Sequence, residues 1–200
     1  MLTCDNIACS RWGKMLFKGL GFTLLPGSLL VPVTPDARTK TLLLEVMAGV
    51  KNPKSGAVWF EDYPIRGNAG YARYRIYLPR HTTLPDKLST FDAAAQLSGD
   101  EDRRLINAAL HYFELDAFAD TPIGELPPAL KPRVHLTPLL THPCPLWIID
   151  KPNTPLDDAT LSLLYALVAG RCNQEGIVVM GWDNTDFIAP LIAIDLKDFR

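Results

Sequence analysis

The sequence predicts an α/β protein with a mainly parallel core sheet, an N-terminal antiparallel β part and an inserted helical subdomain. Short apolar runs alternate with helical stretches near both ends of the chain, as in strands joined by crossover helices. Between residues 80 and 142 the pattern is helical, without a convincing strand. We therefore expect a single domain over residues 1–200, with a core of 1–79 and 143–200 and a helical subdomain of 80–142.

The composition indicates a folded protein of an ordinary kind. The chain has 200 residues, 48% of them apolar and 21% charged, which is enough for one α/β domain with a full core. A formal net charge of -2 gives no reason to expect nucleic acid as a partner. No apolar run reaches the roughly 20 residues that span a bilayer, and the N-terminus lacks a signal-peptide pattern. Four cysteines without CxxC spacing are expected to be buried thiols in a reducing cytosol.

The N-terminal part alternates apolar and polar residues over 2–9 and 21–25, as half-buried antiparallel strands do. A Pro26-Gly27 turn leads to a more continuously apolar strand over 29–33, typical of a strand covered on both faces. A helix is expected over 40–50, ending at Gly49, followed by a turn at 52–56. Further strands are predicted over 57–60 and 73–78.

The remaining elements follow the same two periodicities. Helices are predicted over 89–98, 101–114 and 129–142, and Pro132 and Pro138 are expected to shorten or kink the last one. The expected packing stripe of the middle helix comprises Leu105, Ala108, Ala109, Tyr112 and Phe113. Strands over 145–150, 176–182 and 191–196 and a helix over 157–172 complete the α/β pattern.

The segment between strand 29–33 and the following helix has the layout of a phosphate-binding P-loop. Lys40 and Thr41 stand at the start of the helix, where such a loop has its phosphate-binding Lys and its metal-binding hydroxyl. The motif requires glycine at three positions, which are occupied here by Thr34, Ala37 and Thr39. Glycine lets the backbone reach a positive φ and lets phosphate approach, and a β-branched threonine resists both.

Seven segments, taken in order, resemble the ATP-binding subunits of ABC transporters over almost the whole chain. They are LFKGLGFTLLPGSLL, KTLLLEVMAG, NPKSGAVWF, IYLPRHTTL, AALHYFELDAFADTPIGEL, PLWIIDKPNTPLD and GIVVMGW. The chain is most similar to the short subunits that serve cytochrome c biogenesis and haem export. The resemblance implies the P-loop NTPase fold of the ABC ATPases, with ATP and Mg²⁺ as the ligands.

The resemblance also implies which residues would contact the nucleotide. They are Thr34, Asp36, Ala37, Arg38, Thr39, Lys40 and Thr41, with Trp12 either stacking on adenine or serving only as a core or surface residue. Thr41 and Asp150 would hold Mg²⁺ if nucleotide binds. Asp36 would place a carboxylate beside the phosphates. Because each lost N–H contact to a charged group costs about 1.5–3 kcal/mol, we expect ATP to bind weakly, at about millimolar levels, or not at all.

The residues that the family uses for hydrolysis are replaced. Lys151 stands where a glutamate should polarise the attacking water, and a cation cannot accept its proton. Asp183 stands at the position of the switch histidine, and His81 at that of the glutamine before the helical subdomain. The signature loop, expected as LSGGQ, reads LPPAL over 126–130; its two prolines remove two N–H donors. Arg133 matches a basic position just beyond it.

Three functions remain open. The first is an ABC subunit for cytochrome c biogenesis and haem export that hydrolyses ATP poorly or not at all and acts by subunit contacts. The second is an active ATPase with divergent motifs, supported by Lys40, Thr41, Asp150, Leu156 and Asp157. The third is a binding module outside transport, in which His81, Lys151 and Asp183 form a new site in the nucleotide cleft.

The resemblance implies partners and a location. The partners are membrane permease subunits and a second ABC subunit, the same or different, and the place is the cytoplasmic face of the cell membrane or of an organelle's inner membrane. Leu84, Leu88 and Phe91 lie where the family receives a helix of the permease, although a helix packing its own core would show the same pattern.

Overall fold

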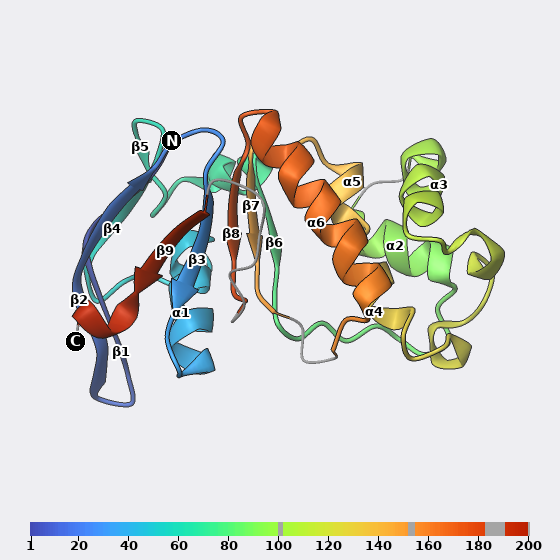
Figure 1. Ribbon diagram of the computed structural model, residues 1–200, viewed down its shortest axis with the longest axis horizontal. Helices are drawn as coiled ribbons and strands as arrows, with labels where there is room; N and C mark the ends of the chain where they lie inside the picture. Colours follow the sequence, from blue (N-terminus) through green and yellow to red (C-terminus); the bar gives the residue numbers. More distant parts are fainter. Residues whose placement is uncertain (100–101, 152–154, 183–190, 200) are drawn as a thin grey trace. The chain divides into compact units, whose positions relative to one another are not determined.

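The computed structural model describes residues 1–99, 102–151, 155–182 and 191–199. Contacts between Cα atoms divide the chain into two compact units (Figure 1). Unit 1 comprises Met1–Tyr77, Cys144–Lys151 and Ala169–Arg200, and unit 2 comprises Leu78–Pro143 and Pro152–Val168. Unit 2 thus takes in a segment beyond residues 80–142, because the first part of the last long helix packs with it.

Unit 1 contains a four-stranded sheet in the order β2-β1-β4-β5. Its strands are β1 (Leu2–Arg11), β2 (Lys14–Leu24), β4 (Ser55–Phe60) and β5 (Tyr63–Pro64), and all the neighbours are antiparallel. The predicted antiparallel N-terminal part is confirmed, although β2 begins seven residues earlier than predicted. Trp12 and Gly13 join β1 to β2 with φ values of 49° and 78°, the conformation of a tight hairpin turn.

The second sheet of unit 1 has five strands in the order β6-β7-β8-β3-β9. They are β6 (Arg75–Leu78), β7 (Leu146–Ile149), β8 (Ile177–Met180), β3 (Leu29–Val33) and β9 (Leu191–Asp195). β3 is parallel to both β8 and β9, and β7 is parallel to β8 (Figure 1). The mainly parallel core predicted from the continuous apolar runs is therefore confirmed. All residues of β7 and β8 are buried, as expected for strands covered on both faces.

Helix α1 (Ala37–Met47) follows β3 and packs its apolar face into the core of unit 1. The helix begins three residues before the predicted Lys40, because Asp36 caps it, and Gly49 follows it with a φ of 71°. Two 3₁₀ helices, η1 (Ala69–Tyr74) and η4 (Leu196–Phe199), lie in the same unit. Residues 73 and 74 were predicted as strand and instead end η1, which the side chain of Asn68 caps.

Unit 2 is helical among the residues that the structure describes, with one isolated β-bridge between Ser89 and Pro122. Its helices are α2 (Thr90–Ser98), α3 (Arg103–Tyr112), α4 (Lys131–Leu136), α5 (Pro138–Thr141), η2 (Asp116–Phe118), η3 (Ile123–Glu125) and the first part of α6 (Asp158–Asn173). The predicted interruption of the helix over 129–142 is confirmed: α5 begins anew at Pro138, which has no backbone N–H to continue α4.

The predicted packing stripe of α3 is wrong in its rotation. Leu105 is 40% exposed and Ala108 is also exposed. The buried residues are Ile106, Ala109, Leu110 and Phe113, which form a stripe of the same spacing that starts one residue later. A shift of one residue turns a helix face by about 100°, so a sequence with apolar residues in both registers does not fix the buried face. Within the described ranges, no helix is long and apolar enough to cross a membrane.

Candidate functional site

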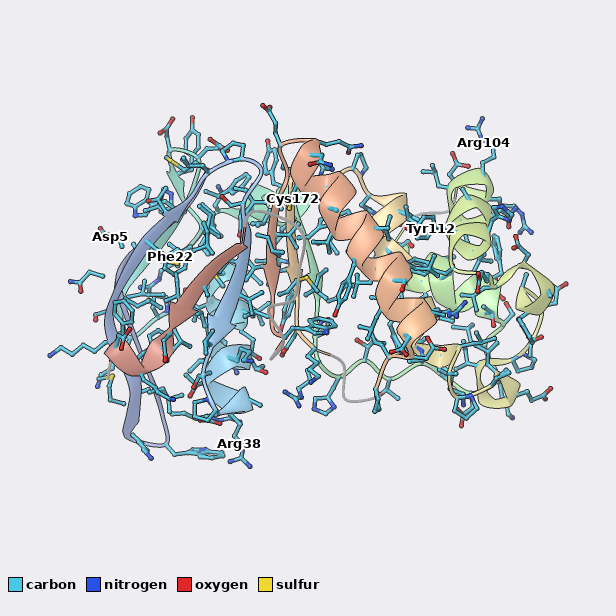
Figure 2. All side chains as sticks on the ribbon, in the orientation of Figure 1. Asp5, Phe22, Arg38, Arg104, Tyr112 and Cys172 are labelled. Atoms are coloured by element: carbon cyan, nitrogen blue, oxygen red, sulfur yellow. The ribbon has the colours of Figure 1, made fainter. Side chains whose placement is uncertain are left out.

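The segment from Thr34 to Thr41 leads from β3 into α1, and its backbone is that of a capped helix start. The structure describes every residue from Thr34 to Thr41, and none of them has a positive φ. A phosphate-cradling loop needs such conformations, which glycine adopts without strain. With Thr34, Ala37 and Thr39 at the glycine positions, the chain instead begins its helix at Ala37. Figure 2 shows Arg38 at this end of α1.

Asp36 accepts the hydrogen bonds that hold this helix start together. Its Oδ1 accepts from the backbone N–H of Arg38 at 3.0 Å, and its Oδ2 accepts from the hydroxyl of Thr39 at 2.8 Å. Its backbone carbonyl accepts from the N–H groups of Thr39 and Lys40 at 3.1 and 3.2 Å. The hydroxyl of Thr39 and the neighbouring N–H groups hold the pKa of the Asp36 carboxyl below its usual range. Asp36 is therefore ionised at neutral pH.

Lys40 points into the interior of unit 1. The residue is only 3% exposed, and its ammonium donates to the backbone carbonyl of Trp182 at 2.9 Å, just beyond β8. A buried ammonium needs such a partner, because removing it from water without one is costly. The cation expected to meet phosphate is thus bound to the protein's own backbone.

Thr41 and Asp150 form the second part of the candidate site. The hydroxyl of Thr41 donates to Oδ2 of Asp150 at 2.6 Å, joining the second turn of α1 to the residue after β7. Asp150 is 2% exposed. Gly181 leaves room for this carboxylate, because a Cβ there would lie 2.8 Å from Oδ1 of Asp150 and 3.2 Å from a methyl group of Leu44. A hydroxyl and a carboxylate are oxygen ligands that suit Mg²⁺.

Comparisons with known proteins identify the family. The sequence profile described as "ABC transporter" matches residues 17–154. The chain belongs to this family of transporter ATP-binding domains. It is 33% identical to the cytochrome c biogenesis ATP-binding export protein CcmA of Paramagnetospirillum magneticum, over 89% of this chain and 85% of that one. It is 31% identical to the CcmA of Wolbachia pipientis, over 100% of this chain and 98% of the relative.

Solved structures of the family have the same fold. An ABC transporter ATP-binding protein from Pyrococcus furiosus aligns with a TM-score of 0.83 over 99% of this chain and 98% of that one, at 19% identity. A dimeric ATP-binding cassette in a post-hydrolysis state, bound to ADP and Pi, aligns with a TM-score of 0.79 over 98% and 94%, at 18% identity. The predicted ABC ATPase fold is therefore confirmed.

Membership of the family implies ATP with Mg²⁺ as the ligand, and the two parts of the candidate site fit this ligand unequally. Thr41 and Asp150 suit the metal. The phosphate part does not fit, because no residue from Thr34 to Thr41 has a positive φ and the backbone N–H of Arg38 donates to the Asp36 carboxylate. A negative carboxylate at the helix N-terminus also opposes a second anion there. Within the described residues, no cluster of His, Cys, Asp and Glu forms a metal site.

The other residues singled out from the sequence lie in several places. Lys151 follows Asp150 in unit 1 and is half-buried, whereas His81 is exposed in unit 2. Asp183 lies outside the described residues. Trp12 is 82% exposed at the hairpin tip between β1 and β2, with the Arg11 guanidinium 4.6 Å from its ring centre. A core role for this tryptophan is therefore excluded, and its ring is open to stacking.

The segment at the signature position, 126–130, is a turn between η3 and α4 and not a helix start with a side-chain cap. Leu130 precedes α4 without any side-chain hydrogen bond to it. The predicted helix start at 129 is therefore two residues early. Leu126 is buried, whereas Pro127 and Pro128 are exposed. Since proline has no N–H, these two positions offer no backbone donor to a ligand.

Arg133, just beyond this segment, is fixed within unit 2. It is 4% exposed, and its Nε donates to the hydroxyl of Thr160 at 2.9 Å. Its Nη1 donates to the carbonyl of Phe113 at 3.1 Å and to Oε2 of Glu114 at 2.6 Å. Arg133 thus ties α4 to the end of α3 and to the start of α6.

Sequence reasoning missed three of these features. The carbonyl of Trp182 as partner of Lys40 carries no sequence signal, because any residue supplies a carbonyl. The role of Gly181 could have been suspected, because a glycine directly after a buried strand often marks a close approach. The partners of Arg133 depend on tertiary contacts among three segments that are distant in sequence.

Proposed function

We propose that the protein is the ATP-binding-type subunit of an ABC transporter for cytochrome c biogenesis and haem export, and that it acts by subunit contacts with little or no ATP hydrolysis. The family membership and the named relatives support the transporter role. In this proposal the chain works as a single domain beside membrane permease subunits, on the cytoplasmic face of the membrane, paired with a second ABC subunit.

One observation carries the loss of hydrolysis. Lys40, the cation that would neutralise the phosphates, is buried and donates to the backbone carbonyl of Trp182 at 2.9 Å. To reach phosphate, the ammonium must give up this hydrogen bond in the interior of the protein. A hydrogen bond from a charged group contributes about 1.5–3 kcal/mol, and a weak ligand must supply that energy.

The replaced chemical groups support the same conclusion. Lys151 follows Asp150, where a base for the attacking water is expected, and an ammonium cannot take up a proton. ABC sites are composite, with the phosphate loop of one subunit facing the signature loop of the other. Since this chain has lost both, an intact partner would meet a defective half in each of its two sites.

ATP turnover tests the proposal. Purified protein is assayed with saturating Mg-ATP beside the variant Lys40→Ala, which serves as the zero-activity reference. We expect the two rates to be equal within error, alone and with a permease present. A wild-type rate at least tenfold above that of the variant would show an active ATPase and reject the proposal.

A second candidate is an active ATPase with divergent motifs. The observation that favours it is the bond between Thr41 and Asp150 at 2.6 Å, which keeps both metal-binding oxygen groups of the site together. The turnover assay decides between the two candidates.

The proposed contact with the permease involves Leu84, Leu88 and Phe91 in unit 2. All three are half-buried, and the Arg103 guanidinium lies 4.3 Å from the ring centre of Phe91. Apolar side chains that remain partly accessible are suited to receive an apolar helix of a partner.

Cysteine crosslinking tests this contact. The native cysteines are all buried, so a thiol reagent will report mainly on an introduced cysteine. We expect Leu84→Cys and Leu88→Cys to form a specific adduct with a co-expressed permease. Leu105→Cys, at an exposed position of α3 in the same unit, is the matched control. Equal labelling at all three positions, or no adduct at 84 and 88, would count against the contact.

A further inference from the structure

A single residue accepts the polar hydrogens at the beginning of α1. The carboxylate of Asp36 accepts from the backbone N–H of Arg38 at 3.0 Å, and its backbone carbonyl accepts from the N–H groups of Thr39 and Lys40 at 3.1 and 3.2 Å. Asp36 also binds the hydroxyl of Thr39 at 2.8 Å, and its own N–H donates to the hydroxyl of Thr34 at 3.3 Å. In a phosphate-binding loop, backbone N–H groups of this kind face the ligand.

The carboxylate of Asp36 also supplies the charge that such a loop normally receives from its ligand. A helix N-terminus carries partial positive charge and is stabilised by an anion within its first turn. Here the anion is covalently attached, and it is held by two hydrogen bonds from α1 itself. A phosphate group approaching the same place meets a negative charge, and the carboxylate already engages the N–H of Arg38 and the hydroxyl of Thr39.

We propose that the Asp36 carboxylate is a built-in anion that opposes phosphate at the start of α1, and that removing its charge measurably improves the binding of phosphate groups there. The inference rests on the proposed function, because it names one of the features that exclude nucleotide from the site. It assigns part of the exclusion to this one carboxylate, in addition to the missing glycines.

Two variants of Asp36 separate the effect of its negative charge from the effect of its hydrogen-bond acceptors. Asp36→Asn removes the charge and keeps a side chain that caps helices well. Asp36→Gly removes the charge and both side-chain acceptors, and it lets the backbone adopt a positive φ. The matched control is Asp102→Gly, because Asp102 caps α3 in the same way, accepting from the N–H of Arg104 at 2.9 Å.

The probe is inorganic pyrophosphate, which tests the phosphate contacts without adenine. Its binding is measured by calorimetry and by the rise of the thermal midpoint with ligand concentration. We expect no saturable binding by the wild type or by Asp102→Gly. Asp36→Asn should bind measurably, and Asp36→Gly should bind with a dissociation constant at least about tenfold below the wild-type limit, as loss of one close charge repulsion predicts.

Two results would overturn the inference. If Asp36→Gly melts cooperatively and shows no more binding than the wild type, the carboxylate does not oppose phosphate. If the wild type binds pyrophosphate as well as the variants do, removing the charge does not improve binding. The first result leaves the proposed function standing, since ATP would still be excluded. The proposed function fails separately, when the wild type hydrolyses Mg-ATP faster than Lys40→Ala.

Discussion

The two parts of the candidate site in unit 1 differ in how they use their polar groups. At the beginning of α1, Asp36 binds the groups that would face phosphate. One turn further along, Thr41 and Asp150 still present two oxygen groups 2.6 Å apart. A phosphate loop depends on backbone conformations that glycine adopts readily, and this chain has Thr34, Ala37 and Thr39 at the positions concerned. The metal part depends on the packing of α1 against the strands, which the apolar core maintains.

Unit 2 also has a segment with few polar contacts next to a residue that makes several of them. Residues 126–130 contain two prolines in place of backbone donors. Arg133, three residues later, is buried and makes hydrogen bonds to Thr160, Phe113 and Glu114. Arg133 is thus fixed by contacts within unit 2, whereas the exposed prolines offer no N–H donor to a ligand.

The largest expected effect is the loss of the Arg133 contacts. We expect Arg133→Ala to lower the free energy of unfolding by about 2–4 kcal/mol, because it removes charge-assisted hydrogen bonds and leaves the carbonyl of Phe113 without its donor. Chemical denaturation measures this. Arg104→Ala is the control: its side chain is 92% exposed in its ion pair with Asp102, so no measurable change is expected. Equal effects of both variants would contradict a structural role of Arg133.

A methyl group at Gly181 tests the tight packing of the metal part. Because the added Cβ would lie 2.8 Å from Oδ1 of Asp150, we expect Gly181→Ala to cost about 1–3 kcal/mol of unfolding free energy. Gly170→Ala, where the added Cβ meets nothing within 4 Å near the C-terminal end of α6, should instead stabilise the protein by about 0.5–1 kcal/mol. The thermal midpoints of the two variants should move in opposite directions, and a common direction would refute this packing.

Substitution of Thr41 and of Thr39 compares how much the metal part and the phosphate part of the site contribute to the free energy of unfolding. Thr41→Val removes the bond to buried Asp150 and should cost about 1–2 kcal/mol. Thr39→Val removes the bond to the more accessible Asp36 and should cost about 0.5–1 kcal/mol. Denaturation of both variants under one set of conditions gives the order, and the reverse order would show that the Asp36 cluster holds the site together.

The smallest expected effect is a change in acid stability. The pKa of Asp36 is lowered in the folded protein, chiefly by the hydroxyl of Thr39, so its contribution is complete above the unfolded-state pKa and is lost as pH falls through the folded-state value. In Asp36→Asn we expect a shallower loss of stability below about pH 4. The difference should not exceed about 1 kcal/mol, typical of a helix cap. Unfolding curves between pH 2 and 6, an interval centred near the carboxyl pKa, provide the test; identical slopes would mean that Asp36 is not a cap in solution.

Much of the fold followed from local patterns. The buried runs at 29–33, 145–150 and 176–182 were predicted as core strands, and β3, β7 and β8 lie within them. The buried face of α3 was not predictable, because apolar residues occupy two adjacent registers. In the site, the sequence showed which residues stand at the expected glycine positions, namely Thr34, Ala37 and Thr39. The helix start at Ala37 and the bond from Lys40 to Trp182 required three-dimensional contacts.

The central claim is that the phosphate part of the site no longer binds nucleotide, and Mg-ATP binding by calorimetry tests it most directly. The thermal midpoint is followed in parallel as the nucleotide rises to millimolar levels. A ligand of the native state raises the midpoint according to its concentration relative to its dissociation constant. We predict no saturable heat and a constant midpoint, equal to that of Lys40→Ala. A saturable rise that Lys40→Ala abolishes would contradict the account and show that the nucleotide switch has survived.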